Sequence, residues 1–163
     1  MNTRNHILLP IAALTMALAS CATEADRTGD TIDRHQAEER VEEHLQNSTG
    51  AFAEDITLEN AGAVNTPPCD DARSGVPEGL VQVSKGYRLR DLPHEDNGEN
   101  VRVLIEHWES NGYAVREDAR GETNFVSVEH EDDGFVLSLR ESVQGTVTLR
   151  AASPCIWPEG TPD

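Results

Sequence analysis

The histidines of this 163-residue chain are the side chains that could most readily hold a metal or move a proton. Beyond the first twenty residues their spacing contains neither H-x-x-x-H nor H-E-x-x-H, the patterns that place two imidazoles on one side of a helix. Local spacing therefore predicts no metal site and no cofactor, and a zinc site assembled from distant segments is the alternative that stays open. The histidines concerned are His35, His44, His94, His107 and His130.

Sequence motifs for covalent catalysis and for phosphate binding are absent. The chain has no G-x-S-x-G turn, no S-x-x-K pair, and neither G-x-x-x-x-G-K nor G-x-G-x-x-G. Residues 129–134 carry carboxylates at the first, third and fifth positions of a calcium-like loop and glycine at the sixth, but the twelfth position is Arg140 where a bidentate glutamate is needed. We interpret them as a solvated acidic hairpin turn. No catalytic residue is predicted, and we do not expect an enzyme.

The N-terminal residues have the order of an export signal. Residues 1–6 are polar with one positive charge, and residues 7–19 are apolar apart from Pro10 and Thr15. This run is too short for a comfortable transmembrane helix, which needs about 20 residues. It ends in Leu18-Ala19-Ser20-Cys21, which resembles the bacterial lipobox, where a diacylglycerol is joined to the cysteine sulfur before cleavage on its amino side.

The lipobox resemblance implies that residues 1–20 are a cleaved signal peptide and that Cys21 is lipidated. Residues 21–30 are small, polar and charged, which is typical of a flexible tether. Two acyl chains give stable anchoring where one would be marginal, so we expect the protein on the extracytoplasmic face of the cell membrane. In the alternative, Cys21 merely begins an ordinary secreted chain.

Cys69 and Cys155 are the two cysteines left once Cys21 carries lipid. An even pair outside the cytoplasm is typical of a disulfide, and each of the two follows proline, which favours ordered loops. The chain has no C-x-x-C spacing to lower a thiol pKa, so a catalytic redox pair is not indicated. We predict a structural Cys69–Cys155 disulfide.

The chain is strongly acidic. It has 30 Asp and Glu against 13 Lys and Arg, a formal net charge of −17. Such a surface disfavours nucleic acid and anionic lipid headgroups as partners. The same charge also keeps an exported protein soluble, which is reason enough for it.

Residues 31–159 are predicted to form a single α+β domain, followed by a tail at residues 160–163. Thr31 is a candidate N-cap for a first helix that Gly50 ends, with an apolar side made by Ile32, Ala37, Val41 and Leu45. We expect one or two further strands after it. Strand patterns occur at residues 56–59, 80–84 and 87–89, the last two separated by a bulge or bend at Gly86.

The second half of the chain changes from helical to strand periodicity. Apolar residues at i, i+3, i+4 and i+7 predict a central helix that Gly112 ends, and they are Val101, Leu104, Ile105 and Trp108. Four alternating segments follow, at residues 113–118, 124–129, 135–142 and 146–152. Short turns connect them, so we expect a four-stranded antiparallel meander.

Alternation gives this sheet two faces. One can supply a core, with Val115, Val126, Val128, Leu137, Leu139, Val147 and Leu149. The opposite parity carries Arg116, Arg140 and Arg150 among Ser127, Ser138 and Thr148. Arginine suits bidentate capture of carboxylate or phosphate, so this is the candidate binding face. Ordinary cross-strand pairing with Glu117, Glu129 and Glu141 is the alternative.

The lipobox, the acidic tether, the cysteine pair and the segment Ser153-Pro154-Cys155-Ile156-Trp157-Pro158 together resemble small actinobacterial lipoproteins of unknown function. The resemblance implies a cell-surface location and an α+β domain, and it brings no catalytic residues. We therefore expect a non-catalytic binding or scaffolding lipoprotein, which presents its domain to an envelope protein or a cell-wall component. The alternative is an enzyme that modifies wall or lipid. A deep pocket of carboxylates or histidines would favour the enzyme, and a flat open sheet would favour binding.

Overall fold

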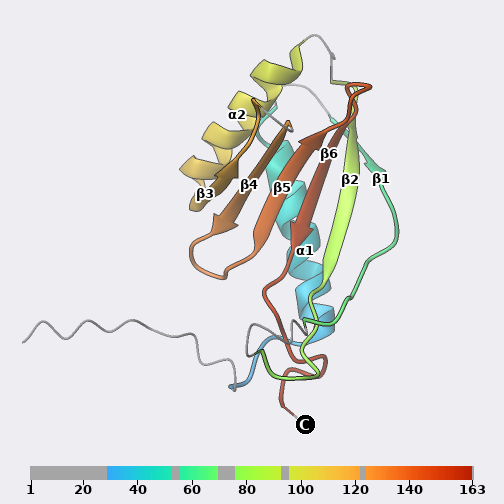
Figure 1. Cartoon of the computed structure of the whole chain (residues 1–163), viewed down its shortest axis with the longest axis vertical. Helices are drawn as coiled ribbons and strands as arrows, with labels where there is room; N and C mark the ends of the chain where they lie inside the picture. Colours follow the sequence, from blue (N-terminus) through green and yellow to red (C-terminus); the bar gives the residue numbers. More distant parts are fainter. Residues whose placement is uncertain (1–28, 53–55, 70–75, 93–95, 122–123, 163) are drawn as a thin grey trace, which may run out of the picture.

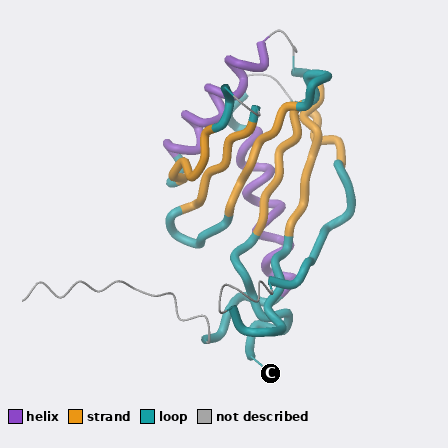
Figure 2. Tube along the Cα trace, viewed as in Figure 1, coloured by secondary structure: helices purple, strands orange, loops and turns teal. Residues whose placement is uncertain are grey.

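The computed structural model describes residues 29–52, 56–69, 76–92, 96–121 and 124–162. Two helices and one six-stranded antiparallel sheet form an α+β domain, as predicted, and both helices lie on the same face of the sheet (Figures 1 and 2). The elements are α1 Arg34–Thr49, β1 Thr57–Asn60, β2 Ser84–Arg90, α2 Asn97–Ser110, β3 Tyr113–Asp118, β4 Phe125–His130, β5 Val136–Glu141 and β6 Val147–Ala152.

The strand order is β1-β2-β6-β5-β4-β3. From β3 to β6 each strand pairs with its successor, and β6 then pairs with β2, which precedes α2 in the chain. The last strand therefore joins the two halves of the protein into one sheet. Within the described residues neither helix has the length and apolar composition needed to cross a bilayer.

The core lies between the helices and one face of the sheet. Register places Tyr87, Leu149, Leu139 and Val126 in one row across four strands, all of them buried. Of the core residues predicted for the last four strands, only Val115 is substantially exposed, at 41 %, because β3 is an edge strand. Trp108 of α2 is almost fully buried, and its indole nitrogen donates a hydrogen bond to Ser48 of α1.

The first helix begins at Arg34, and Asp33 rather than Thr31 is its N-cap. The Asp33 carboxylate accepts a hydrogen bond from the backbone N–H of Gln36, whose side chain returns the bond to the backbone of Asp33. Thr31 is instead used in tertiary structure, because its hydroxyl accepts a hydrogen bond from the backbone N–H of Trp157. The predicted cap was therefore wrong by two residues.

Gly86 lies inside β2 and does not break it, contrary to the sequence prediction. A β-carbon at this position would lie 2.9 Å from Cγ of Arg150, its register partner on β6. Glycine thus lets the stem of the arginine lie across β2. The preceding segment makes only isolated bridges, such as Val81 with Pro68 and with Ile156.

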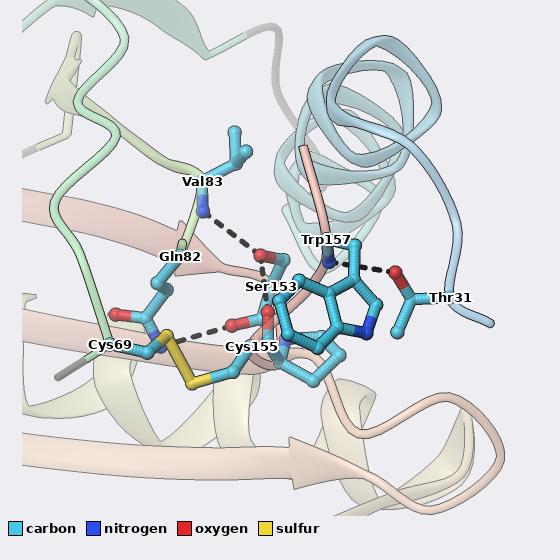
Figure 3. The surroundings of a disulfide bond; sticks show 8 residues. Thr31, Cys69, Gln82, Val83, Ser153, Cys155 and Trp157 are labelled. Carbon is cyan, nitrogen blue, oxygen red and sulfur yellow. Dashed lines mark hydrogen bonds between the residues drawn. A yellow bond between two sulfur atoms is a disulfide. The ribbon is translucent and has the colours of Figure 1, made fainter. Parts of the chain in front are cut away.

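The Cys69–Cys155 disulfide is present, as predicted (Figure 3). The two Cα atoms are 6.1 Å apart, within the usual range for a disulfide. Around it, Ser153 accepts hydrogen bonds from the backbone N–H of Val83 and from the side chain of Gln82. These bonds fasten the C-terminal segment to the residues just before β2, and the backbone N–H of Arg34 at the start of α1 donates to the carbonyl of Pro158.

Glu42 of α1 bonds to β2 on the sheet face that the helices cover. Its carboxylate accepts a hydrogen bond of 2.7 Å from Nζ of Lys85 and bonds from the hydroxyl of Tyr87. The hydrogen bond to Glu42 raises the pKa of Lys85 above its ordinary value. A raised lysine pKa stabilises the fold at pH values below the ordinary one, and that contribution is lost as the pH rises through the folded-state value.

We expect Glu42→Gln to lower the pKa of Lys85 toward its ordinary value, because the substitution removes the negative charge that favours the ammonium form. Lys85 is the only lysine in the chain, so carbon-13 methylation and an NMR pH titration can follow it individually. Glu59→Gln is the matched control, since Glu59 pairs with Arg88 and Arg90. An unchanged Lys85 pKa in Glu42→Gln would show that the contact is unimportant in solution.

Candidate functional site

A polar pocket of about 380 Å³ lies between the two helices and the end of the sheet nearest β3. Its wall includes side chains from α1, α2, β3, β4 and the turn between β4 and β5. The lining residues are Arg40, Glu43, His44, Asn47, Ser48, His107, Trp108, Asn111, Tyr113, His130 and Asp133. Four of them make a connected group, His44, Tyr113, His130 and Asp133, here called the histidine cluster.

His44 is the buried centre of the histidine cluster, with only 5 % of its surface exposed. Its Nδ1 lies 2.5 Å from the hydroxyl of Tyr113, and its Nε2 lies 3.2 Å from Oδ2 of Asp133. Burial lowers the pKa of His44 although the nearby Asp133 carboxylate opposes the shift. Burial disfavours the charged form of Tyr113 as well, and this raises the pKa of its hydroxyl to about 12.

These shifts determine the hydrogen-bond directions. Burial alone would raise the pKa of Asp133, but hydrogen bonds from His130 and the backbone of Phe135 bring it below the ordinary value. An ionised carboxylate only accepts hydrogen bonds, so a neutral His44 must donate from Nε2. Its Nδ1 then accepts a hydrogen bond from the protonated Tyr113.

Asp133 also binds the second histidine of the cluster. Its Oδ1 lies 2.7 Å from Nδ1 of His130, so one carboxylate joins both imidazoles. The ring of His130 packs against that of Tyr113 with centroids 4.8 Å apart, and His44 packs on Phe135 at the same separation. Aromatic contacts and hydrogen bonds thus hold the imidazole nitrogens and the Asp133 oxygens in place.

We found no protein-family model, curated protein or solved structure that matches this chain.

The histidine cluster was not predicted, although one of its members carried a signal. His44 lies three residues after Val41 and beside Leu45, on the buried side of α1. A histidine inside an apolar stripe has to find a polar partner, and this could have marked it. Nothing local connects it to Asp133, which is 89 residues away. His35 lies on the exposed surface and His107 bonds to the carbonyl of Asn47, while His94 lies outside the described residues.

The sheet face that the helices leave open, here called the uncovered face, carries the predicted arginines. They differ in whether they form an ion pair. Register places Arg140 opposite Thr148 and Arg150 opposite Ser138, so both are on this face. The stem of Arg150 crosses Gly86, and the guanidinium of Arg140 lies over the ring of Phe125 at 4.9 Å. In the described part of the chain, neither arginine forms an ion pair.

Arg116 differs from the other two arginines. It falls where the register of β3 shifts between Val115 and Glu117, and its Nε lies 3.1 Å from Oε2 of Glu129. Cross-strand pairing therefore accounts for Arg116. Glu141 accepts a hydrogen bond from Asn97 of α2 and, within the described residues, forms no ion pair with Arg140 or Arg150. Cys21 lies outside the described residues, so the predicted lipid attachment point has no structural description.

Proposed function

We propose that this protein is a lipid-anchored extracytoplasmic lipoprotein whose domain binds an acidic partner on the uncovered sheet face. The anchor is inferred from Leu18-Ala19-Ser20-Cys21 after an apolar run. The observation that carries the binding role is the pair Arg140 and Arg150, which face solvent without a carboxylate partner in the described structure. The partner would be an envelope protein or a cell-wall component that offers carboxylate or phosphate groups.

The local chemistry of this face suits an anion despite the net charge of −17. Ser138 and Thr148 stand opposite the two arginines and can donate hydroxyl hydrogen bonds. Arg140 rests on an aromatic ring and Arg150 on a glycine, so each guanidinium has support from the sheet beneath it. A supported guanidinium loses less conformational entropy when it binds a carboxylate or phosphate.

Arg140→Ala and Arg150→Ala should each weaken binding of an acidic probe by about 1 to 3 kcal/mol, the range for hydrogen bonds to charged groups. Two probes separate the anion types: a glutamate-rich peptide and a glycerol-phosphate oligomer, each titrated by calorimetry. Both variants should keep the thermal stability of the parent protein, because an exposed side chain leaves no cavity.

Arg102→Ala is the matched control for this titration. Arg102 is an exposed arginine of α2 that pairs with Glu99 and Glu106, away from the uncovered face. Its removal should leave binding of either probe unchanged. The proposal fails if the parent protein binds neither probe, or if Arg102→Ala weakens binding as much as Arg150→Ala does.

An enzyme acting on wall or lipid is the second candidate, and the histidine cluster is the observation that favours it. The pocket gathers histidines and a carboxylate, as an enzyme would require. The one serine in its wall is not a free nucleophile, because the hydroxyl of Ser48 is bonded to the carbonyl of His44 and to Trp108. Tyr113, with its pKa raised to about 12, stays protonated. Binding therefore ranks first.

A further inference from the structure

We propose that His44, His130 and Asp133 bind a divalent transition-metal ion, with zinc the best match to their donor set. One ligand atom from each residue lies within 4.8 Å of the other two. These residues come from α1, the end of β4 and the turn that follows it, so the fold itself assembles the group. This group is separate from Arg140 and Arg150 on the uncovered sheet face.

The donor atoms lie within 4.8 Å of one another, so side-chain adjustments are needed to bring them around one tetrahedral ion. Oδ2 of Asp133 lies 3.2 Å from Nε2 of His44, and the other oxygen, Oδ1, lies 2.7 Å from Nδ1 of His130. Ligands about 2.1 Å from a tetrahedral zinc stand roughly 3.4 Å from one another. An ion at the centre would replace the two hydrogen bonds that now join the carboxylate to the imidazoles.

The two nitrogens and one carboxylate select the class of ion. Imidazole donors suit zinc, copper or nickel, whereas calcium and magnesium prefer oxygen ligands. Three protein ligands leave one coordination position, which can be filled from the pocket by water or by a small ligand. The acidic surface attracts cations, and Glu43 adds a carboxylate to the same pocket, opposed by Arg40.

Tyr113 is placed to support the metal-bound form. When zinc takes Nε2 of His44, the proton of that nitrogen moves to Nδ1, and the Tyr113 hydroxyl at 2.5 Å becomes its acceptor. Imidazole ligands of metals usually make such a bond through their second nitrogen. His130 can bind the ion through Nδ1 and carry a proton on Nε2.

The test uses the full-length protein purified in detergent, stripped with a chelator and titrated with zinc chloride against a chromogenic competitor. We expect one zinc per chain and at least tenfold weaker binding in His130→Gln and in Asp133→Asn. Tyr113→Phe should weaken zinc binding about tenfold, as loss of a supporting partner does. His107→Gln is the control, because His107 lines the same pocket but bonds to the backbone of Asn47.

Two further measurements keep the result decisive if a variant is unstable. Thermal unfolding in the presence of chelator shows whether each variant folds without metal. Cobalt(II) bound to the parent protein should give the visible absorption of a four-coordinate site, and calcium or magnesium should not displace it. The proposal is overturned if the parent protein binds no zinc saturably, or if His130→Gln and Asp133→Asn bind zinc as the parent does. The cluster would then be a hydrogen-bonded support of the fold.

Discussion

Cys21→Ser should release the protein from the membrane into the soluble envelope fraction. Serine has no thiol to receive a diacylglycerol, so the mature chain would lose the acyl chains that hold it. Each buried methylene contributes about 0.8 kcal/mol to membrane attachment, and two chains together make that attachment stable. Detergent partitioning and the mass of the mature N-terminal peptide measure the effect directly.

The control for this experiment is Thr23→Ser, a conservative change two residues beyond the lipobox, which should leave the protein in the detergent phase. An unmodified Cys21 in the parent protein would contradict the prediction. So would a Cys21→Ser chain that is still held on the membrane as firmly as the parent. Either result would leave an ordinary secreted chain as the better interpretation.

Replacing Cys69 and Cys155 together by serine should destabilise the domain by up to about 4 to 5 kcal/mol. The disulfide closes a loop of 86 residues, and the chain-entropy model gives this range for a loop of that length. Native strain would subtract from the figure, so it is an upper value. Urea unfolding of the double variant and of the parent, followed by tryptophan fluorescence, measures the difference.

The fold of the double variant should persist at low urea, because backbone bonds hold the same segments. Cys69 donates its backbone N–H to the carbonyl of Leu80, and Val81 exchanges two backbone hydrogen bonds with Ile156. The Cys21→Ser chain, with its disulfide intact, is the control for loss of a cysteine alone. A double variant within about 1 kcal/mol of the parent would mean that the bridge adds little to stability.

Local patterns predicted most of the secondary structure. The apolar spacing of Val101, Leu104, Ile105 and Trp108 marked α2, and all four side chains are buried. Alternation and short turns located the last four strands within one or two residues. These features depend on neighbours close in the chain, so periodicity reports them. Cysteine parity predicted the disulfide for a different reason: with Cys21 expected to carry lipid, Cys69 and Cys155 are left as one pair.

Errors arose where a distant segment decides the role of a residue. Thr31 has the side chain of an N-cap, but the C-terminal segment takes its hydroxyl through Trp157. Gly86 resembles a strand break, yet it lies within β2 because Arg150 from β6 crosses it. In both cases local propensity was overridden by a contact more than 60 residues away.

The sequence by itself determined the helices, most strands and the two faces of the sheet, because these depend on short-range periodicity. It also determined the pairing of Cys69 with Cys155, because these two remain once Cys21 is assigned to lipid. Only the tertiary structure decided which charges are neutralised and which polar side chains meet. Arg116 pairs with Glu129, a contact that alternation allowed but could not distinguish from a solvated arginine. His44 meets Asp133 because α1 packs against the end of β4 and its turn. Such contacts depend on how whole helices and strands pack, so they cannot be predicted from the spacing of residues along the chain.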